Sequence, residues 1–188
     1  MGALTLANQM TLLRLGLVPA FVILLLYGRV GWAFAVFVTA GITDALDGLV
    51  ARRRNQRTAL GALLDPMADK LLLVSAFVVL TLPGLGLVNR LPVWLTILVI
   101  SRDVAIVVTV AIISLTVGHR SFPPSIYGKI ATGVYIVTVA IVLLFNYLGR
   151  RSVLVDVGVW TSLAITVVSG LHYTAHVRRV LNEPPASP

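Results

Sequence analysis

The sequence is organised as long apolar runs separated by short breaks that contain glycine, proline or charged residues. Six apolar runs can be drawn, at residues 12–28, 31–51, 61–83, 92–117, 125–148 and 153–174. Each is close to or above the roughly 20 residues that an α-helix needs to cross a bilayer. The breaks contain turn-forming residues, among them Gly28, Pro83-Gly84 and Gly149, which interrupt helices. The pattern predicts an all-α integral membrane protein, a bundle of six transmembrane helices.

Two terminal segments lie outside these runs. In residues 1–11, apolar and polar residues alternate, which predicts a short helix lying in the membrane interface. The tail from about Asn182 is rich in proline and is predicted to be disordered. The first apolar run lacks a cleavage site of small residues, so we expect a retained helix and not a signal peptide. No internal repeat is visible, and residues 1–188 are predicted to form a single membrane domain.

The composition supports a membrane protein and excludes several other classes. Of the 188 residues, 58% are hydrophobic and 12% are charged, and the mean hydropathy is +0.97. A soluble domain needs a polar exterior and cannot hide this much apolar surface. The chain has no cysteine, which excludes disulfides. Its net charge of +8 does not indicate nucleic-acid binding, because the basic residues gather at the ends of apolar runs, next to membrane lipid headgroups.

The distribution of basic residues predicts the orientation in the membrane. With the amino terminus inside, the cytoplasmic ends carry nine: Arg14, Arg52, Arg53, Arg54, Arg57, Arg120, Lys129, Arg178 and Arg179. The outer ends carry four: Arg29, Arg90, Arg150 and Arg151. Trp32, Trp94 and Trp160 then fall toward the outer side, as an interfacial belt does. We therefore predict cytoplasmic termini, with the 52–60 loop facing the cytoplasm of a bacterial inner membrane.

The candidate chemistry lies in one run of acidic and small residues. It reads Asp44-x-x-Asp47-Gly48-x-x-Ala51-Arg52, then eight residues, then Gly61-x-x-x-Asp65-x-x-x-Asp69, and it holds four of the seven acidic residues. Carboxylates spaced by three or four residues share one face of a helix. Inside a membrane, bare carboxylates are costly and therefore functional. Four carboxylates from two facing helices suit hard divalent cations such as Mg²⁺ or Mn²⁺, and two such ions indicate transfer of a phosphorus-centred group.

Structural alternatives exist for each part of this run. Gly48 and Gly61 leave room for a bulky ligand beside the carboxylates, but glycine also permits close helix packing in membranes. The aspartates could form buried ion pairs with Arg52, Arg53 and Lys70. Four acids on two stripes, however, need more positive charge than these three side chains supply in an apolar setting, which favours metal binding.

The run over residues 44–69 resembles the signature of the CDP-alcohol phosphotransferase family, D-x-x-D-G-x-x-A-R, eight residues, G-x-x-x-D-x-x-x-D. Every fixed position matches at every spacing. The hydropathy of residues 4–175 is also similar to the six-helix bundle of that family. Two further stretches look like its phospholipid-making branch, namely Asn8-x-x-Thr11-x-x-Arg14 and Gly128-Lys129.

The resemblance implies a reaction and a role for each motif residue. Such enzymes bind CDP-diacylglycerol at the cytoplasmic face, move its phosphatidyl group to an alcohol and release CMP; the family also implies a homodimer. Asp44, Asp47 and Asp65 would bind the metal ions, and Asp69 would act as the base while also touching a metal. The remaining matched positions would line the nucleotide pocket: Gly48, Ala51, Arg52, Gly61, Asn8 and Thr11.

The acceptor alcohol is less clearly indicated. Arg102, Arg120 and Lys129 are candidates to bind an acceptor phosphate, as fixed cations do. Arg102 stands in Ser101-Arg102-Asp103, in the middle of an apolar run, where charge is either functional or part of a structural polar cluster. Glycerol 3-phosphate is the expected acceptor, which implies phosphatidylglycerophosphate as product. The alternative is phosphatidylglycerol, which implies cardiolipin, and the Ser101-Arg102-Asp103 triplet looks more like that branch.

A transporter of divalent cations is the rival class, because it too uses intramembrane carboxylates. A transporter needs polar residues across the full depth of the membrane, and the first and sixth apolar runs are almost wholly apolar. It also has no need for Gly48, Ala51 and Gly61 beside the carboxylates. The pattern therefore favours an enzyme.

Overall fold

The fold is known from a computed structural model that describes the backbone of residues 6–54, 59–116 and 126–182. Side chains are described for residues 13–43, 70–109, 112 and 126–174. Within these ranges the chain forms six helices and no strand: α1 (Leu6–Leu26), α2 (Val30–Arg54), α3 (Ala59–Thr81), α4 (Val93–Thr116), α5 (Ile126–Tyr147) and α6 (Val153–Asn182). The all-helical prediction is confirmed, and each helix overlaps one predicted run.

The two ends of the chain differ from the prediction. A separate interfacial helix over residues 1–11 is not present among the described residues, because α1 runs without a break from Leu6. Residues 6–11 contain neither glycine nor proline, so nothing interrupts the helix there. The last helix continues eight residues beyond the predicted span, to Asn182. The predicted disordered tail after Asn182 lies outside the described residues.

Two of the helix ends are formed by the same local sequence. Gly28 and Gly149 have φ values of 69° and 64°, a left-handed conformation that glycine adopts without a steric penalty. After α1, the amide of Arg29 donates to the carbonyl of Leu24 at 2.8 Å; after α5, Arg150 donates to Phe145 at 3.0 Å. These bonds are those of the Schellman motif, which satisfies carbonyls left open at a helix end. A Gly-Arg pair therefore reverses the chain at both places.

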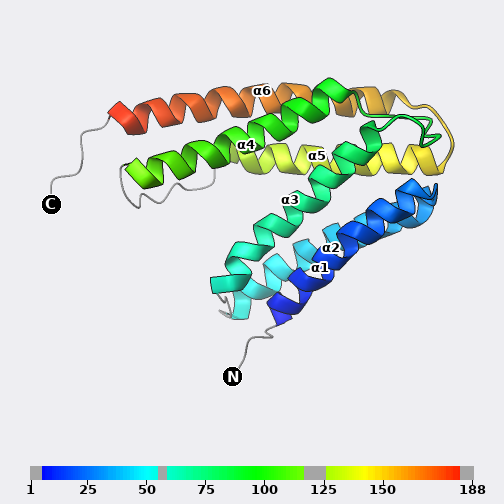
Figure 1. Ribbon diagram of the computed structural model, residues 1–188, viewed down its shortest axis with the longest axis horizontal. Helices are drawn as coiled ribbons and strands as arrows, with labels where there is room; N and C mark the ends of the chain where they lie inside the picture. Colours follow the sequence, from blue (N-terminus) through cyan, green and yellow to red (C-terminus); the bar gives the residue numbers. More distant parts are fainter. Residues whose placement is uncertain (1–5, 55–58, 117–125, 183–188) are drawn as a thin grey trace.

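The three described connections, 27–29, 82–92 and 148–152, lie together at one end of the bundle, on the right in Figure 1. We call this the turn end. Asn89 joins two of the connections: its amide donates to Oδ1 of Asn146 at 2.8 Å, and its Nδ2 donates to the carbonyl of Arg150 at 2.7 Å. The opposite end contains the beginning of α1, the end of α2 and the beginning of α3 (Figure 1).

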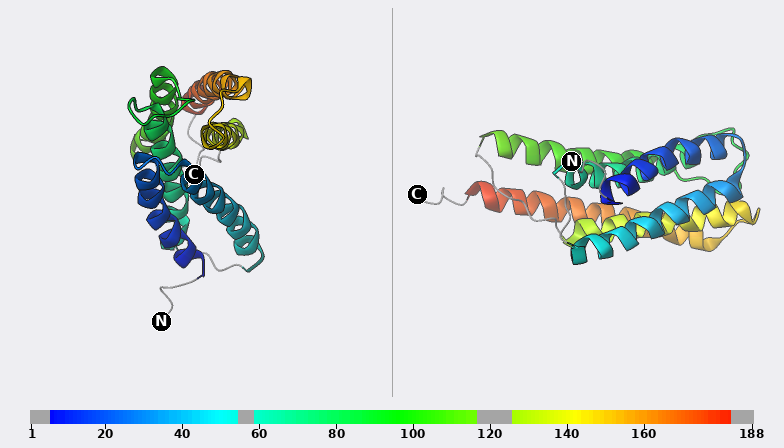
Figure 2. Two further views of the ribbon diagram at one scale, coloured as in Figure 1. Left: turned by 90° about the vertical axis from the view of Figure 1, so that its right-hand side faces the viewer. Right: turned by 90° about the horizontal axis from the view of Figure 1, so that it is seen from below.

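The core lies where α1, α2, α3 and α5 meet. Phe21 of α1 contacts Phe37 of α2, with ring centroids 5.9 Å apart, and Phe77 of α3 meets the edge of Tyr135 at 5.6 Å. Helix α1 packs on both α2 and α3, whereas α5 packs most extensively on α6. Figure 2 shows α5 and α6 side by side in both views. Close packing of these side chains stabilises the core, because lipid tails are as apolar as the side chains and transfer from water contributes little between membrane helices.

Many large apolar side chains remain exposed on the outside of the helices. Examples on four different helices are Ile23, Ile97, Val137 and Val157, each more than half exposed. Exposed apolar surface on this scale is costly in water and suits lipid. Among the described residues, two segments are long and apolar enough to cross a membrane, Ile126–Tyr147 and Val153–Thr174. The protein is therefore an all-helical membrane protein.

Candidate active site

The acidic motif lies at the end of the bundle opposite the turn end. Asp44 and Asp47 belong to the second half of α2, and Asp65 and Asp69 to the first half of α3. With a rise of about 1.5 Å per residue, Asp47 and Asp65 each lie about 10 Å, and Asp44 and Asp69 each about 15 Å, from the helix ends that residues 55–58 join. The helices thus offer two levels with one aspartate from each helix.

The side chains of residues 44–69 lie outside the described part of the structure. The predicted roles of Asp44, Asp47, Gly48, Ala51, Arg52, Gly61, Asp65 and Asp69 therefore remain predictions. Among the described side chains, no group of three histidine, cysteine, aspartate or glutamate residues could hold a metal ion.

The beginning of α1 lies at the level of the motif. The turn at residues 27–29 reverses the chain between α1 and α2, so equal distances from this turn give equal levels. Thr11 on α1 and Asp44 on α2 each lie about 22 Å from the turn. The backbone therefore places Asn8 and Thr11 at the motif level, and their side chains lie outside the described residues.

The position of Arg14 in the structure differs from the position that its charge suggested. The sequence suggested a basic residue at the cytoplasmic end of a span, but the structure buries Arg14, which is 4% exposed. A buried guanidinium is retained only where acceptors surround it, because its desolvation is costly. Arg14 therefore belongs to the interior of the bundle, one turn away from the level of Thr11 on the same helix.

A charged network joins α3, α4 and α6 immediately beside the motif. Asp103 of α4 accepts from Nη1 of Arg102 at 2.6 Å through Oδ1, and its Oδ2 lies 3.3 Å from Nζ of Lys70 on α3. Nη2 of Arg102 donates to Oγ of Ser169 on α6. We call Lys70, Arg102, Asp103 and Ser169 the charged network. Because Lys70 directly follows Asp69, the network lies one residue from the predicted base.

Burial differs sharply along this network. The Arg102 side chain is 10% exposed and that of Asp103 is 21% exposed, whereas that of Lys70 is half exposed. Nε of Arg102 is buried and has no hydrogen-bond partner within the described part of the chain. The network is therefore a largely buried polar cluster, in which Lys70 is the most exposed member.

Sequence reasoning identified only part of this network. It singled out Arg102, and it considered Lys70 as a partner of the motif aspartates, whereas the structure pairs Lys70 with Asp103. Asp103 was visible as a charge next to Arg102 in an apolar run. Ser169 gave no signal, because a single serine in a membrane helix usually serves packing.

Of the other two acceptor candidates, the structure describes Lys129. Lys129 is exposed in the first turn of α5. At the turn end, a Cβ atom added to Gly31 of α2 would lie 2.7 Å from the ring of Tyr147 on α5. Measured from this contact along the two antiparallel helices, Lys129 on α5 and Gly48 on α2 each lie about 26 Å away. Lys129 is therefore level with the motif. Arg120 lies outside the described residues.

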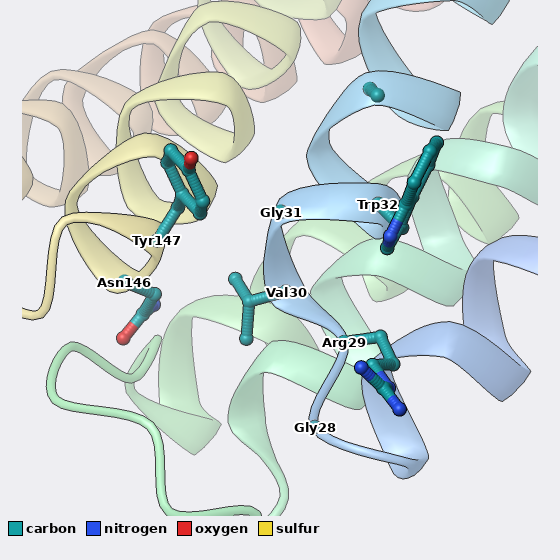
Figure 3. Close-up of a pocket in the computed structure, with 8 residues that line it drawn as sticks. Gly28, Arg29, Val30, Gly31, Trp32, Asn146 and Tyr147 are labelled. Atoms are coloured by element: carbon teal, nitrogen blue, oxygen red, sulfur yellow. The ribbon is translucent and has the colours of Figure 1, made fainter.

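A pocket lies at the turn end, at the opposite end of the bundle from the acidic motif. It has a volume of about 620 Å³ and is lined by residues of the α1–α2 turn and the end of α5. Figure 3 shows Arg29, Trp32, Asn146 and Tyr147 around it. Asn146 already bonds to Asn89 and to the carbonyl of Val142. The residues lining this pocket include no carboxylate.

Comparison with known proteins decides the family. Residues 4–168 match the profile of the family described as CDP-alcohol phosphatidyltransferase. The chain belongs to this family. The resemblance deduced from the acidic motif is thereby confirmed, and the protein is a CDP-alcohol phosphatidyltransferase, a transferase of phospholipid biosynthesis. The transporter alternative is not supported.

Relatives of this phosphatidyltransferase carry two different names. The chain is 37% identical over 183 residues to a probable phosphatidylglycerophosphate synthase of Mycobacterium tuberculosis, covering 93% of this chain and 82% of the relative. It is 34% identical over 191 residues to a CMP-forming cardiolipin synthase of Streptomyces coelicolor, covering 95% and 85%. The human CMP-forming cardiolipin synthase is 33% identical over 198 residues, covering 93% and 62%. Both products considered above, phosphatidylglycerophosphate and cardiolipin, thus appear in the names of similar proteins.

Proposed function

We propose that this phosphatidyltransferase moves the phosphatidyl group of CDP-diacylglycerol to a glycerol-type acceptor that carries a phosphate, and releases CMP. The family match and the names of the relatives support this reaction class. The single structural observation that supports an acceptor site is the contact of Lys70 with Asp103. It brings Arg102, the basic residue predicted for the acceptor, next to the helix turn that carries Asp69.

The reaction forms one bond and breaks one. The acceptor hydroxyl oxygen attacks the phosphorus that bears the diacylglycerol, the bond from this phosphorus to the bridging oxygen breaks, and that oxygen leaves with CMP. The hydroxyl proton goes to a base within hydrogen-bond reach. We assign this role to Asp69, because it is the motif aspartate farthest along α3 from Gly61 and adjacent to Lys70 of the charged network.

The four aspartates suit the divalent ions that the family implies. Asp44, Asp47, Asp65 and Asp69 would hold two Mg²⁺ or Mn²⁺ ions, since hard cations prefer carboxylate oxygens. When bound, the ions neutralise the diphosphate and stabilise the leaving CMP. Asp44 and Asp69, and likewise Asp47 and Asp65, lie at similar distances from the helix ends that residues 55–58 join, which supports a donor set shared between α2 and α3.

The nucleotide pocket lies beside these carboxylates. We assign it Gly48, Ala51 and Gly61, whose small side chains leave room for the cytidine diphosphate, together with Arg52. Asn8 and Thr11 join the pocket from α1, whose first turns lie at the motif level.

The acceptor phosphate is assigned to basic residues on the other side of the motif. Arg102 is held by Asp103 and Ser169, which fix the plane of its guanidinium, and a fixed guanidinium binds phosphate oxygens well. Lys129, level with the motif on α5, is placed to meet a phosphate arriving from the cytoplasm. Arg120 is the third candidate.

For the membrane, we propose six spans with both termini and the active site on the cytoplasmic side. The charge bias along the sequence supports this orientation. The position of exposed aromatic side chains agrees with it: Tyr27, Trp32, Tyr147 and Trp160 are each more than 60% exposed and lie near the turn end, where an interfacial belt is expected.

The test is CMP release by the purified full chain in mixed micelles with CDP-diacylglycerol, Mg²⁺ and each acceptor in turn, with mass spectrometry of the lipid formed. We expect CMP and a new phospholipid in equal amounts. Folded protein that binds CDP-diacylglycerol yet releases no CMP with any glycerol-type acceptor would refute the proposed reaction.

A further inference from the structure

A second pocket at the turn end brings two arginines together from different connections. It has a volume of about 370 Å³, and six of its lining residues matter here: Asn89 and Arg90 of the α3–α4 connection, and Arg151, Ser152, Val153 and Asp156 at the beginning of α6. Arg90 and Arg151 are exposed, and neither forms an ion pair within the described part of the chain. We call this site the basic pocket.

Hydrogen bonds fix the two segments that carry these arginines. Nδ2 of Asn89 donates to the carbonyl of Arg150 at 2.7 Å, and the backbone amide of Asn89 donates to Oδ1 of Asn146 at 2.8 Å. Nδ2 of Asn146 donates in return to the carbonyl of Asn89 at 2.8 Å. Arg90 follows Asn89 and Arg151 follows Arg150, so the backbone beside both arginines is held while their side chains stay available. A pocket formed in advance loses less conformational entropy when it binds a ligand.

The turn end carries an excess of positive charge. Its charged residues are Arg29, Arg90, Arg150, Arg151 and a single acid, Asp156, which gives a net charge of +3. In the proposed orientation this end lies on the outer side of the membrane, where basic residues are usually few. The orientation therefore does not explain these arginines. Guanidinium groups bind phosphate oxygens through paired donors, so the basic pocket suits a negatively charged ligand that contains phosphate.

The surface next to the pocket is apolar and lies close to the level of the headgroups. Val153, Val157 and Trp160 share one face of α6, and each is more than half exposed. The ring of Trp160 lies 6.2 Å from that of Trp94 on α4, between centroids. Tryptophan marks the depth of the lipid headgroups. A ligand in the pocket thus meets cations at its head and an apolar surface that continues along α6 toward the middle of the bilayer.

We infer that the basic pocket is a binding site for an anionic phospholipid of the leaflet at the turn end. Arg90 and Arg151 bind its phosphate, and one acyl chain lies along Val157 and Trp160. Asp156 would attract the ammonium of a zwitterionic lipid, but the excess of arginine at this end favours a lipid with net negative charge. The site lies at the opposite end of the bundle from the acidic motif, so this lipid is distinct from the substrates of the phosphatidyl transfer.

The test uses lipids with brominated acyl chains, which quench tryptophan fluorescence on contact. The chain has three tryptophans, and Trp32→Phe leaves Trp94 and Trp160 as reporters beside the pocket. The full chain with this substitution is placed in phosphatidylcholine vesicles at physiological salt. A small fraction of brominated phosphatidic acid, phosphatidylethanolamine or phosphatidylcholine is then added. Bromine close to the headgroup confines quenching to lipids in the leaflet of the two tryptophans, which excludes lipid bound at the acidic motif.

Phosphatidic acid should be preferred to phosphatidylcholine. A basic residue near the headgroups strengthens the binding of an anionic lipid roughly fivefold, so the two arginines should give a preference of about tenfold or more. Arg151→Gln should lower this preference about fivefold. Asp156→Asn removes the opposing carboxylate and should raise it by a similar factor, a gain that misfolding does not produce.

Arg150→Gln is the matched control. Arg150 is exposed and adjacent to Arg151, but it does not line the pocket. Its bond to Asn89 uses the backbone carbonyl, which the substitution retains. The total charge changes by the same amount as in Arg151→Gln, and the preference should remain nearly unchanged.

Four outcomes would overturn the inference, and none depends on CMP release. Equal quenching by phosphatidic acid and phosphatidylcholine excludes an anionic lipid site, and this comparison requires no pocket variant. A preference for phosphatidylethanolamine assigns the pocket to a zwitterionic headgroup. Equal losses in Arg151→Gln and Arg150→Gln assign the preference to the overall charge of the turn end. Abolition of the preference by inorganic phosphate at unchanged ionic strength assigns the pocket to free phosphate, whereas a preference that persists supports the lipid.

Discussion

Replacing Ser169 by alanine tests whether α6 holds Arg102 in position for the acceptor. Ser169 is 1% exposed, and its hydroxyl accepts from Nη2 of Arg102. Alanine removes this acceptor and leaves Nη2 of Arg102 without its partner. The Arg102 side chain is only 10% exposed. Hydrogen bonds to charged groups contribute about 1.5–3 kcal/mol, and about 1.4 kcal/mol corresponds to a factor of ten. Asp103 still holds Nη1, so we expect the lower part of the range.

The expected result is a rise of about tenfold in the KM for the acceptor, since a less well oriented guanidinium binds phosphate less tightly. The affinity for CDP-diacylglycerol should change little, because this ligand is assigned to α1, α2 and α3. The measurement is steady-state CMP release with each substrate varied in turn, together with binding of CDP-diacylglycerol to the purified variant. A merely structural role would not separate the two substrates in this way.

Ser162→Ala is the matched control. Ser162 is a serine of the same helix, fully buried, and its hydroxyl bonds to Thr138 at 3.0 Å and not to Arg102. Ser162→Ala should lower stability by an amount similar to that of Ser169→Ala, about 1 kcal/mol for a neutral hydrogen bond, while the acceptor KM stays the same. Equal changes of acceptor KM in both variants would show that Ser169 acts through general packing, and the positioning argument would then be refuted.

Three further predictions address the metal site, the base and the packing of the bundle. Asp44→Asn, Asp47→Asn and Asp65→Asn should each lower CMP release by orders of magnitude, and exhaustive chelation should abolish it in the wild-type protein; full turnover after chelation contradicts the metal assignment. Asp69→Asn should keep CDP-diacylglycerol binding within a few-fold while the catalytic rate collapses, and parallel loss of binding would make Asp69 only a metal ligand. Gly158→Ala places a Cβ atom 3.1 Å from Cγ2 of Thr138 and should destabilise the α5–α6 contact by about 1–3 kcal/mol. Gly133→Ala adds a Cβ atom in open space and should stabilise α5 by about 0.5–1 kcal/mol. Equal Tm values of the two variants in detergent would contradict the packing argument.

The helices and the reaction class could be predicted because both depend on local sequence. Apolar runs of membrane length and their Gly-containing breaks gave helix positions that the structure confirms within a few residues, except at the two ends of the chain. The motif from Asp44 to Asp69 gave the family, since fixed carboxylates and glycines at fixed spacings serve one chemistry. The continuous start of α1 was missed because polarity alone does not end a helix that contains neither glycine nor proline.

The partners of the charged residues could not be predicted, because they come from helices far apart in the sequence. The pairing of Lys70 with Asp103 and of Arg102 with Ser169 depends on how α3, α4 and α6 pack, and no local pattern encodes this packing. The burial of Arg14 was missed for the same reason. Its charge fitted a position near the cytoplasm, and only its neighbours in the bundle show that it faces inward.

The hydrogen bonds between α5 and α6 have a consequence for how the protein is assembled in the membrane. Four buried hydroxyls of this pair find partners within it: Tyr135 with Thr166, and Thr138 with Ser162 and the carbonyl of Gly158. The buried hydroxyl of Ser169 bonds to Arg102 of α4 instead. The same two helices contain the segments that are long and apolar enough to cross a bilayer. Because these four hydroxyls are paired between the two helices, the pair brings fewer unsatisfied polar groups into lipid. Since α2 and α3, which carry the aspartates, both pack on α5, we expect this pair of helices to form a support for them during assembly in the membrane.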